Sequence, residues 1–289
     1  GLSGAGSVAS KHVGDAKTVT LGTLALGDGG NGGLAGNYTF SGGTQTLDIT
    51  RANLTVTTSD VSKTYDGSLT AAGTAIVDAG SGTQLFDTDS LTDGAFAFTN
   101  ANAGTNKTVT TTGVTVNDGN GGGNYSVSYV DNTSSTIDKA DLTVSSSDVS
   151  KTYDGTLSAN GAAVVTSGTL YHNASNGGTQ DSLSGGTFAF ANKDVSRDGS
   201  GNVLSDKAVT VAAVTLNDGN GGGNYTITYA DNTSSTINPY AVDLSGTRVY
   251  DGMTAAAAAD LSIGALVGTE TLGLSGAGSV ASKHVGDAK

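Results

Sequence analysis

Asn117 to Tyr125 reads NDGNGGGNY, and the same run returns letter for letter at Asn217 to Tyr225. A weaker copy, GDGGNGGLAGNY, occupies Gly27 to Tyr38. Glycine adopts positive φ at no steric cost and Asn tolerates the left-handed region, so each copy predicts a tight loop that leads into a strand at its Tyr. The copies mark an internal repeat, and that repeat decides how the chain is organised.

A second marker opens each repeat. It reads KTYDG at Lys63 to Gly67 and at Lys151 to Gly155, with the variant RVYDG at Arg248 to Gly252. Asp-Gly is a turn signal, and the Tyr before it carries a large ring with a polar tip. The motif therefore predicts a structural corner that a tyrosine anchors in the core, at Tyr65, Tyr153 and Tyr250. The alternative interpretation is a surface that faces a ligand.

The two ends of the chain carry the same sequence, GLSGAGSVASKHVGDAK, at Gly1 to Lys17 and at Gly273 to Lys289. This identity sets a long period, and the two markers divide the chain within it. We predict four segments: the C-terminal half of a repeat at 1–50, complete repeats at 51–138 and 139–238, and the N-terminal half of a repeat at 239–289. The linkers between them are short and contain the sole proline, Pro239, which predicts a stiff rod.

Each complete repeat contains six or seven strand candidates, among them TAIVDA, GAFAF, KTVTTTGVTV and NYSVSYV. Their apolar residues alternate, and Gly, Asn and Asp separate them, which predicts an all-β chain of small Ig-like sandwiches or β-grasp-like domains. Independent domains fit better than a parallel β-helix, because its coils repeat in roughly 20 to 30 residues, far less than one repeat here. The Ala-rich run Thr254 to Leu266 is predicted as strand or loop, and Tyr171 to Gln180 and Asp198 to Asp206 as inserted loops.

The composition limits what the chain can bind. Its 26 acidic and 13 basic residues give a formal net charge of −13, and such a surface repels phosphate, so we expect no nucleic-acid partner. There is no Cys, hence no disulfide or thiolate metal site. No apolar run is long enough to span a bilayer, and Gly1 lies inside a repeat, so we expect neither membrane insertion nor a signal peptide in these residues.

The repeated motifs suggest two kinds of special chemistry. Calcium is one: Asp118, Asn120 and Asn124, with Asp131 beyond the hairpin, offer oxygen ligands, and the Asp218 loop repeats them. A plain hairpin loop is the alternative, because an EF-hand loop places a Glu at its twelfth position and this loop has none. The other is an isopeptide bond from Lys63 or Lys151 to Asn124 or Asn224, against solvated lysines and turn asparagines.

No catalytic constellation recurs from repeat to repeat. His12 and His284 occupy the same repeat position, and His172 lies in an inserted loop. No Ser/His/Asp set or metal triad returns in register with the motifs. We therefore expect no enzyme, no catalytic or metal-ligating residue and no cofactor, apart from the calcium considered above.

The K-T-Y-D-G opening, the G-x-x-x-N-Y close and the A-x-L-T-V strand after each linker resemble the YDG/MBG-type repeats of large bacterial surface adhesins, including filamentous-haemagglutinin-like proteins of two-partner secretion. The resemblance implies an extracellular, cell-attached fibre that extends a binding tip and sometimes holds biofilm matrix together. It implies no catalytic residues. The insertion in the second complete repeat and the RVYDG variant depart from the pattern.

From these observations we expect stalk or spacer repeats of an adhesin or surface filament on the bacterial cell surface. The alternative is a carbohydrate- or matrix-binding module that uses loop residues such as Tyr171, His172 and Asn173. The expected partners are neighbouring repeats or copies of the chain itself. Because 239–289 lacks the GNY half and 1–50 lacks the YDG half, the end of one molecule is expected to complete the beginning of the next, head to tail.

Overall fold

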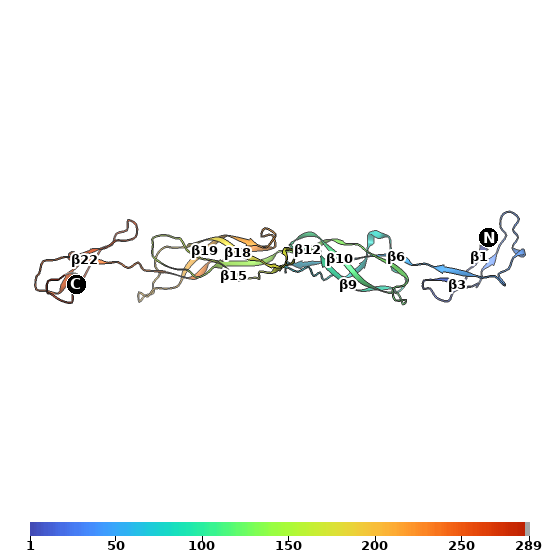
Figure 1. Cartoon of the computed structure of the whole chain (residues 1–289), viewed down its shortest axis with the longest axis horizontal. Helices are drawn as coiled ribbons and strands as arrows, with labels where there is room; N and C mark the ends of the chain where they lie inside the picture. The colour runs from blue at the N-terminus through green and yellow to red at the C-terminus, as the bar shows by residue number, and fades with distance from the viewer. Residues whose placement is uncertain (287–289) are drawn as a thin grey trace. The chain divides into compact units, whose positions relative to one another are not determined.

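The computed structural model describes residues 1–286 and is all-β, which confirms that part of the predicted fold class (Figure 1). Within that range the only helical residues form short 3-10 turns, at Ala35–Asn37, Ala79–Ser81, Ala174–Asn176 and Ala258–Asp260. Among the described residues there is consequently no helix with the length and hydropathy of a membrane span.

The first complete repeat contains seven strands, four of which coincide with the runs TAIVDA, GAFAF, KTVTTTGVTV and NYSVSYV. They are β6 (Ala52–Thr58), β7 (Ser62–Thr64), β8 (Ala75–Val77), β9 (Ser90–Phe98), β10 (Gly104–Asn117), β11 (Tyr125–Tyr129) and β12 (Asn132–Asp138). They form two sheets, in the orders β11-β6-β8 and β7-β12-β10-β9. Two pairings, β6 with β11 and β7 with β12, are parallel, and the other pairings are antiparallel.

The core of this repeat lies between its two sheets. Leu54 and Val56 of β6 meet Val116 of β10, and Tyr125 at the start of β11 packs with them. Leu54 and Val56 are separated by one residue, so they lie on the same face of their strand and are both buried. The Tyr of the GNY motif is thus a core residue, and its position fixes where the preceding loop ends.

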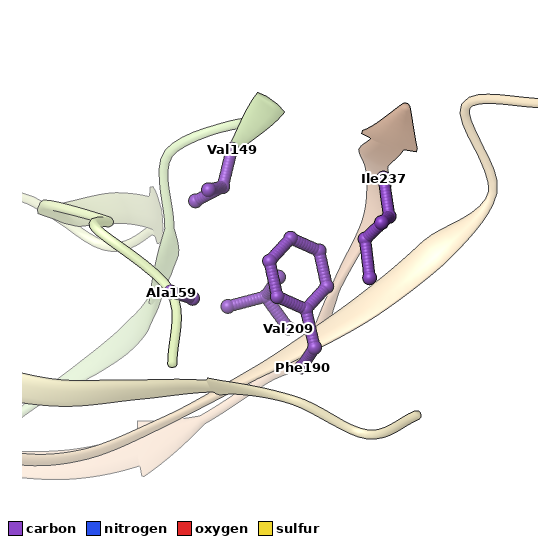
Figure 2. Close-up of a cluster of buried hydrophobic side chains, with 5 residues drawn as sticks. All are labelled: Val149, Ala159, Phe190, Val209 and Ile237. Carbon is purple, nitrogen blue, oxygen red and sulfur yellow. The ribbon is translucent and has the colours of Figure 1, made fainter. Parts of the chain in front are cut away.

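The second complete repeat has the same strand order. Its strands are β13 (Ala140–Ser146), β14 (Ser150–Thr152), β15 (Ala163–Ser167), β18 (Ser182–Phe190), β19 (Lys207–Asn217), β20 (Tyr225–Tyr229) and β21 (Asn232–Asn238). They form the sheets β15-β13-β20 and β14-β21-β19-β18. Figure 2 shows one core cluster, in which Phe190 lies among Val149, Ala159, Val209 and Ile237. A small hairpin, β16 (His172–Asn173) and β17 (Thr179–Gln180), occupies the insertion predicted as a loop.

The two end segments contain smaller sheets. Residues 1–50 form β1 (Leu2–Ser3), β2 (Ser7–Val8), β3 (Gly14–Thr20), β4 (Ala25–Leu26) and β5 (Thr46–Ile49), and residues 239–286 form β22 (Leu244–Gly246), β23 (Ala255–Ala257), β24 (Leu261–Ile263) and β25 (Ala277–Ser279). The Ala-rich run is thus strand and turn, as predicted. No described residue of either segment is buried.

One predicted core anchor is wrong. Tyr250 is 58% exposed, whereas Tyr65 is 1% exposed. The physical reason is that a tyrosine is buried only where other elements pack on it, and the two-stranded sheets of 239–286 provide no such core. The RVYDG corner is therefore present as a turn, with its ring in solvent.

Two compact units divide the chain. The first contains Gly1–Ala140 together with Tyr171–Gln180 and Asp218–Tyr225, and the second contains Asp141–Leu170, Asp181–Asn217 and the described part of Thr226–Lys289. The inserted hairpin and the NDGNGGGNY loop of the second repeat thus belong to the same unit as the first repeat.

Candidate inter-repeat junction

The junction has two sides, both within the first compact unit. One side, here called the socket, consists of the YDG corner Tyr65–Gly67 after β7 and the segment Ala101–Gly104 at the start of β10. The other side consists of two loops of the second repeat, the plug loop Asp218–Tyr225 and the inserted hairpin Tyr171–Gln180. Each side is built from one of the sequence markers together with one further segment.

A buried aspartate shapes the plug loop. One carboxylate oxygen of Asp218 accepts hydrogen bonds from the backbone N–H groups of Asn220 and Gly222, both at 2.8 Å, and the other accepts from Asn224 N–H at 2.9 Å. The glycines that follow Asp218 adopt positive φ, 62° at Gly221 and 81° at Gly222, which explains the glycine run. The loop is thereby folded around its own carboxylate.

The corresponding loop of the first repeat, Asp118–Tyr125, is built in the same way and is also called a plug loop. Its carboxylate accepts from the N–H groups of Asn120, Gly122 and Asn124 at 2.8, 2.8 and 2.9 Å. Burial alone raises the pKa of Asp118, but these three donors favour the charged form, and the resulting pKa lies below its usual value. Each loop therefore surrounds the carboxyl group of its aspartate with three backbone donors.

The last Asn of the plug loop makes the central contact of the junction. Its Oδ1, in Asn224, accepts a hydrogen bond from Ala103 N–H at 2.9 Å, and its Nδ2 donates to Asn102 Oδ1 at 3.2 Å. Asn224 is fully buried. A buried amide with both ends paired fixes the position of the loop that carries it, because losing either bond leaves a polar group without water.

The same contact occurs a second time, one repeat earlier. Asn124 Oδ1 accepts from Val13 N–H at 3.0 Å, and its Nδ2 lies 3.0 Å from His12 Nδ1. Val13 and Ala103 each precede the Gly at which a strand begins, β3 and β10 respectively. The residue before each of them supplies the partner of the amide nitrogen, and that residue differs between the two junctions.

Three aromatic rings meet at the socket. Tyr171 and Tyr225 are stacked, with ring centroids 6.5 Å apart and an interplanar angle of 16°. Tyr65 of the YDG corner lies edge-on to both, at 5.8 Å from Tyr171 and 5.2 Å from Tyr225. Edge-to-face pairs of this kind add about 0.5–1.5 kcal/mol each beyond the area that they bury.

The glycine of the YDG corner is in close contact with the inserted hairpin. Gly67 has φ +74°, and a Cβ added there would lie 2.2 Å from the carbonyl oxygen of His172. Ala174 N–H donates to Gly67 O at 2.8 Å. Only a residue without a side chain fits this contact, so the last letter of YDG is required both by the turn and by the neighbouring hairpin.

The inserted hairpin adds further polar contacts. Asn173 is fully buried, and its Nδ2 donates to Asp218 O at 2.7 Å and to Asn102 Oδ1 at 2.8 Å. Ser175 Oγ accepts from Ala101 N–H at 2.7 Å. The hairpin therefore packs against one side of the junction, and Asn173 is hydrogen-bonded to both the socket and the plug loop.

The second compact unit shows a related contact at its own YDG corner. Tyr153 Oη donates to Glu270 Oε1 at 2.5 Å, and this hydrogen bond, with burial and the negative charge of Glu270, raises the pKa of Tyr153. A Cβ added at Gly155, where φ is +76°, would lie 3.0 Å from Val267 Cγ1. The corner residues of the second repeat thus meet residues of 239–286.

The lysines of the KTYDG motifs brace their own corners. Lys63 Nζ lies 2.7 Å from Asp66 Oδ1, donates to Ser68 O at 2.8 Å and lies 5.4 Å from the centroid of the Phe98 ring. Lys151 repeats this arrangement with Asp154 at 2.7 Å. Asn124 and Asn224 accept hydrogen bonds at the junctions instead, which gives the isopeptide alternative no support.

The plug loops were also the predicted calcium sites. Both oxygens of Asp118 and of Asp218 accept backbone N–H groups, which favours the plain-loop interpretation. Among residues 1–286 no group of three or more metal-ligating His, Asp or Glu side chains gathers. Calcium binding at these loops remains an expectation that a direct experiment has to test.

Sequence reasoning missed the Ala101–Gly104 segment. A sequence signal for it exists, because Ala103 and Val13 lie in two similar segments, NAGTNK and HVGDAK. Both segments place a Gly three residues before a Lys, at Gly104–Lys107 and Gly14–Lys17. Both also contain a non-glycine residue with positive φ at the same place, 48° at Ala16 and 54° at Asn106. Aligning these segments would have shown a third marker.

A family model described as the YDG domain matches residues 50–134 and 232–289. The first range covers the first complete repeat up to β12, and the second includes the RVYDG corner. The match supports a YDG-type domain in this chain, as the KTYDG motif suggested. Neither a curated protein nor a solved structure matches the chain.

Proposed function

We propose that this chain is a structural spacer, a stalk segment of a bacterial extracellular adhesin or surface filament, in which small sandwich-like β repeats follow one another as a rod. One observation carries the proposal: the contact of a plug-loop Asn with a socket N–H occurs twice, at Asn124 with Val13 and at Asn224 with Ala103. A contact that recurs at equivalent positions of successive repeats is suited to connecting those repeats.

The chemistry of the junction suits a spacer. A flexible linker leaves neighbouring domains to reorient, whereas a buried amide, a trio of aromatic rings and a glycine against a backbone carbonyl each tolerate little displacement. Each repeat has only a modest core, so contacts between repeats contribute substantially to holding the repeats in one arrangement. The proposed partners are therefore neighbouring repeats. We also propose that the chain has no catalytic role and is located at the cell surface.

The alternative is a carbohydrate- or matrix-binding module. Its named residues are Tyr171, His172 and Asn173, of which Tyr171 is stacked on Tyr225 and Asn173 is fully buried. These two side chains are occupied at the junction, which favours the spacer over glycan binding by this hairpin. A glycan array with the whole chain separates the two proposals, because specific retention at the hairpin would contradict the spacer.

A spin-label distance measurement tests the spacer directly. The chain has no cysteine, so labels can be placed at Thr115→Cys and Thr215→Cys, equivalent exposed positions on β10 and β19. The proposal predicts one narrow distance distribution, which Asn224→Ala broadens. Asn217→Ala, an exposed Asn on β19, is the matched control and should leave the distribution unchanged. A broad distribution in the unmodified junction would contradict the spacer.

A further inference from the structure

The first complete repeat presents an aromatic pair that matches the covered pair of the next junction. Phe86 and Tyr125 are stacked with centroids 6.5 Å apart and an interplanar angle of 17°, against 6.5 Å and 16° for Tyr171 and Tyr225. The hydrogen bond within each pair is also the same, because Phe86 N–H and Tyr171 N–H each donate to the hydroxyl of the paired Tyr at 2.9 Å. The two pairs are equivalent positions of successive repeats.

The two pairs differ in what lies on them. Tyr65 covers the Tyr171–Tyr225 pair edge-on. No third ring lies on the Phe86–Tyr125 pair among residues 1–286, and Phe86 is 51% exposed. The Asn contact of that junction is in place, since Asn124 is bound to Val13. The ring that Tyr65 supplies at the internal junction has no counterpart on this pair among the described residues.

Within residues 1–286 the chain also carries a YDG corner whose glycine meets no neighbouring element. Tyr250 is 58% exposed, and a Cβ added at Gly252, where φ is +79°, would meet no atom within 4 Å. At Gly67, with nearly the same φ of +74°, the carbonyl of His172 fills that space. The Arg248–Gly252 corner has the backbone of a socket corner and presents its ring to solvent.

We propose that the Phe86–Tyr125 pair of one chain binds the Arg248–Gly252 corner of a second copy, with Tyr250 edge-on to the two rings as Tyr65 is in the internal junction. This inference rests on the proposed function and names its partner and contact residues. Donor and acceptor are different surfaces of the same chain, so the contact is heterologous and extends from copy to copy. The internal junction is the reason for this choice of occupant, because it places the equivalent Tyr65 corner on the equivalent Tyr171–Tyr225 pair.

Two single variants separate the two sides of this contact. Tyr250→Ala removes the donor ring and Phe86→Ala half of the acceptor pair, and each should raise the dissociation constant of self-association about tenfold or more, as buried aromatic anchors do. Tyr240→Ala is the matched control, an exposed Tyr of the same segment outside the corner, and should behave as the unchanged chain.

Sedimentation velocity of the full chain over a concentration series is the test. The unchanged chain should grow beyond dimers, while Tyr250→Ala and Phe86→Ala each remain monomeric over the same range. Their mixture should give dimers and stop there, since it retains one intact donor and one intact acceptor. A monomeric unchanged chain, a Tyr250→Ala variant that associates normally, or a mixture that does not associate overturns the proposal.

The melting curve of each variant shows whether it folds. If Phe86→Ala is unfolded, Tyr250→Ala decides alone, because its ring already lies mostly in solvent. The outcome is independent of the spacer test, which reports on the internal junction of Tyr65 and Asn224. A narrow label distance in a chain that never associates would leave the spacer standing and refute this contact.

Discussion

Replacing the glycine of a YDG corner with alanine should cost far more where the corner is docked than where it is open. Gly67 and Gly252 have φ +74° and +79°, so alanine meets the same left-handed strain at both, about 1–2 kcal/mol. They differ in what a Cβ would meet: His172 O at 2.2 Å in the first case and nothing within 4 Å in the second. The difference in destabilisation between the two variants therefore measures the contribution of the junction contact alone.

The additional cost at Gly67 follows from what the methyl group displaces. A carbonyl at 2.2 Å has to retreat by about 1 Å, which breaks the 2.8 Å bond from Ala174 N–H to Gly67 O, a net loss of about 1 kcal/mol. The edge contact of Tyr65 with Tyr171 at 5.8 Å weakens as well, by about 0.5–1.5 kcal/mol. We expect Gly67→Ala to destabilise the hairpin contact by about 2 kcal/mol more than strain alone.

Amide hydrogen exchange at Ala174 measures this directly, because that N–H is bound across the junction. A local loss of about 2 kcal/mol accelerates exchange roughly thirtyfold in Gly67→Ala. Gly252→Ala should leave the Ala174 rate unchanged. Equal rates at Ala174 in both variants would show that the hairpin does not depend on a close approach to Gly67, and the reasoning would fail.

Three further predictions concern the loops and corners. Asn224→Ala removes the acceptor of Ala103 N–H and should cost about 1–3 kcal/mol, seen as faster exchange of the Ala103 amide, while Asn217→Ala leaves that rate alone. The hydrogen bond from Lys151 lowers the pKa of Asp154 to about 2. Since this folded value lies below the unfolded one, about 3.9, the pair contributes stability above about pH 4 and loses it as the pH falls toward 2. An NMR titration in which the Asp154 carboxyl titrates near 4 would contradict this. Because backbone donors fill the Asp118 carboxylate, calcium added after a chelator should leave the melting midpoint unchanged within about 1 °C, and a rise of several degrees would establish a calcium site.

Local signals in the sequence predicted the strands well. Alternating runs and their Gly, Asn and Asp boundaries depend on neighbouring residues only, and the four runs named above coincide with β8, β9, β10 and β11. The parallel pairing of β6 with β11 was not predicted, because side-chain alternation does not encode strand direction. Tyr65 was correctly placed in the core, and Tyr250 was not, since burial depends on which elements pack on the ring.

The junction was beyond prediction for a related reason. The segment Tyr171–Gln180 was predicted as an inserted loop, and it forms a hairpin that contacts Gly67 and Asn102, which are remote in sequence. Polar loop composition is the same whether a loop is solvated or bound to another loop. Asn173 illustrates this: nothing around it in the sequence distinguishes a surface Asn from one that is fully buried.

The amides of Val13 and Ala103 offer the most direct test that successive repeats share one junction. Each is bound to a plug-loop Asn, at 3.0 and 2.9 Å. Both should exchange far more slowly than the exposed loop amide of Gly199 in the unmodified chain. Exchange of both at the rate of Gly199 would mean that the plug loops do not hold their sockets, and the shared junction would have to be abandoned.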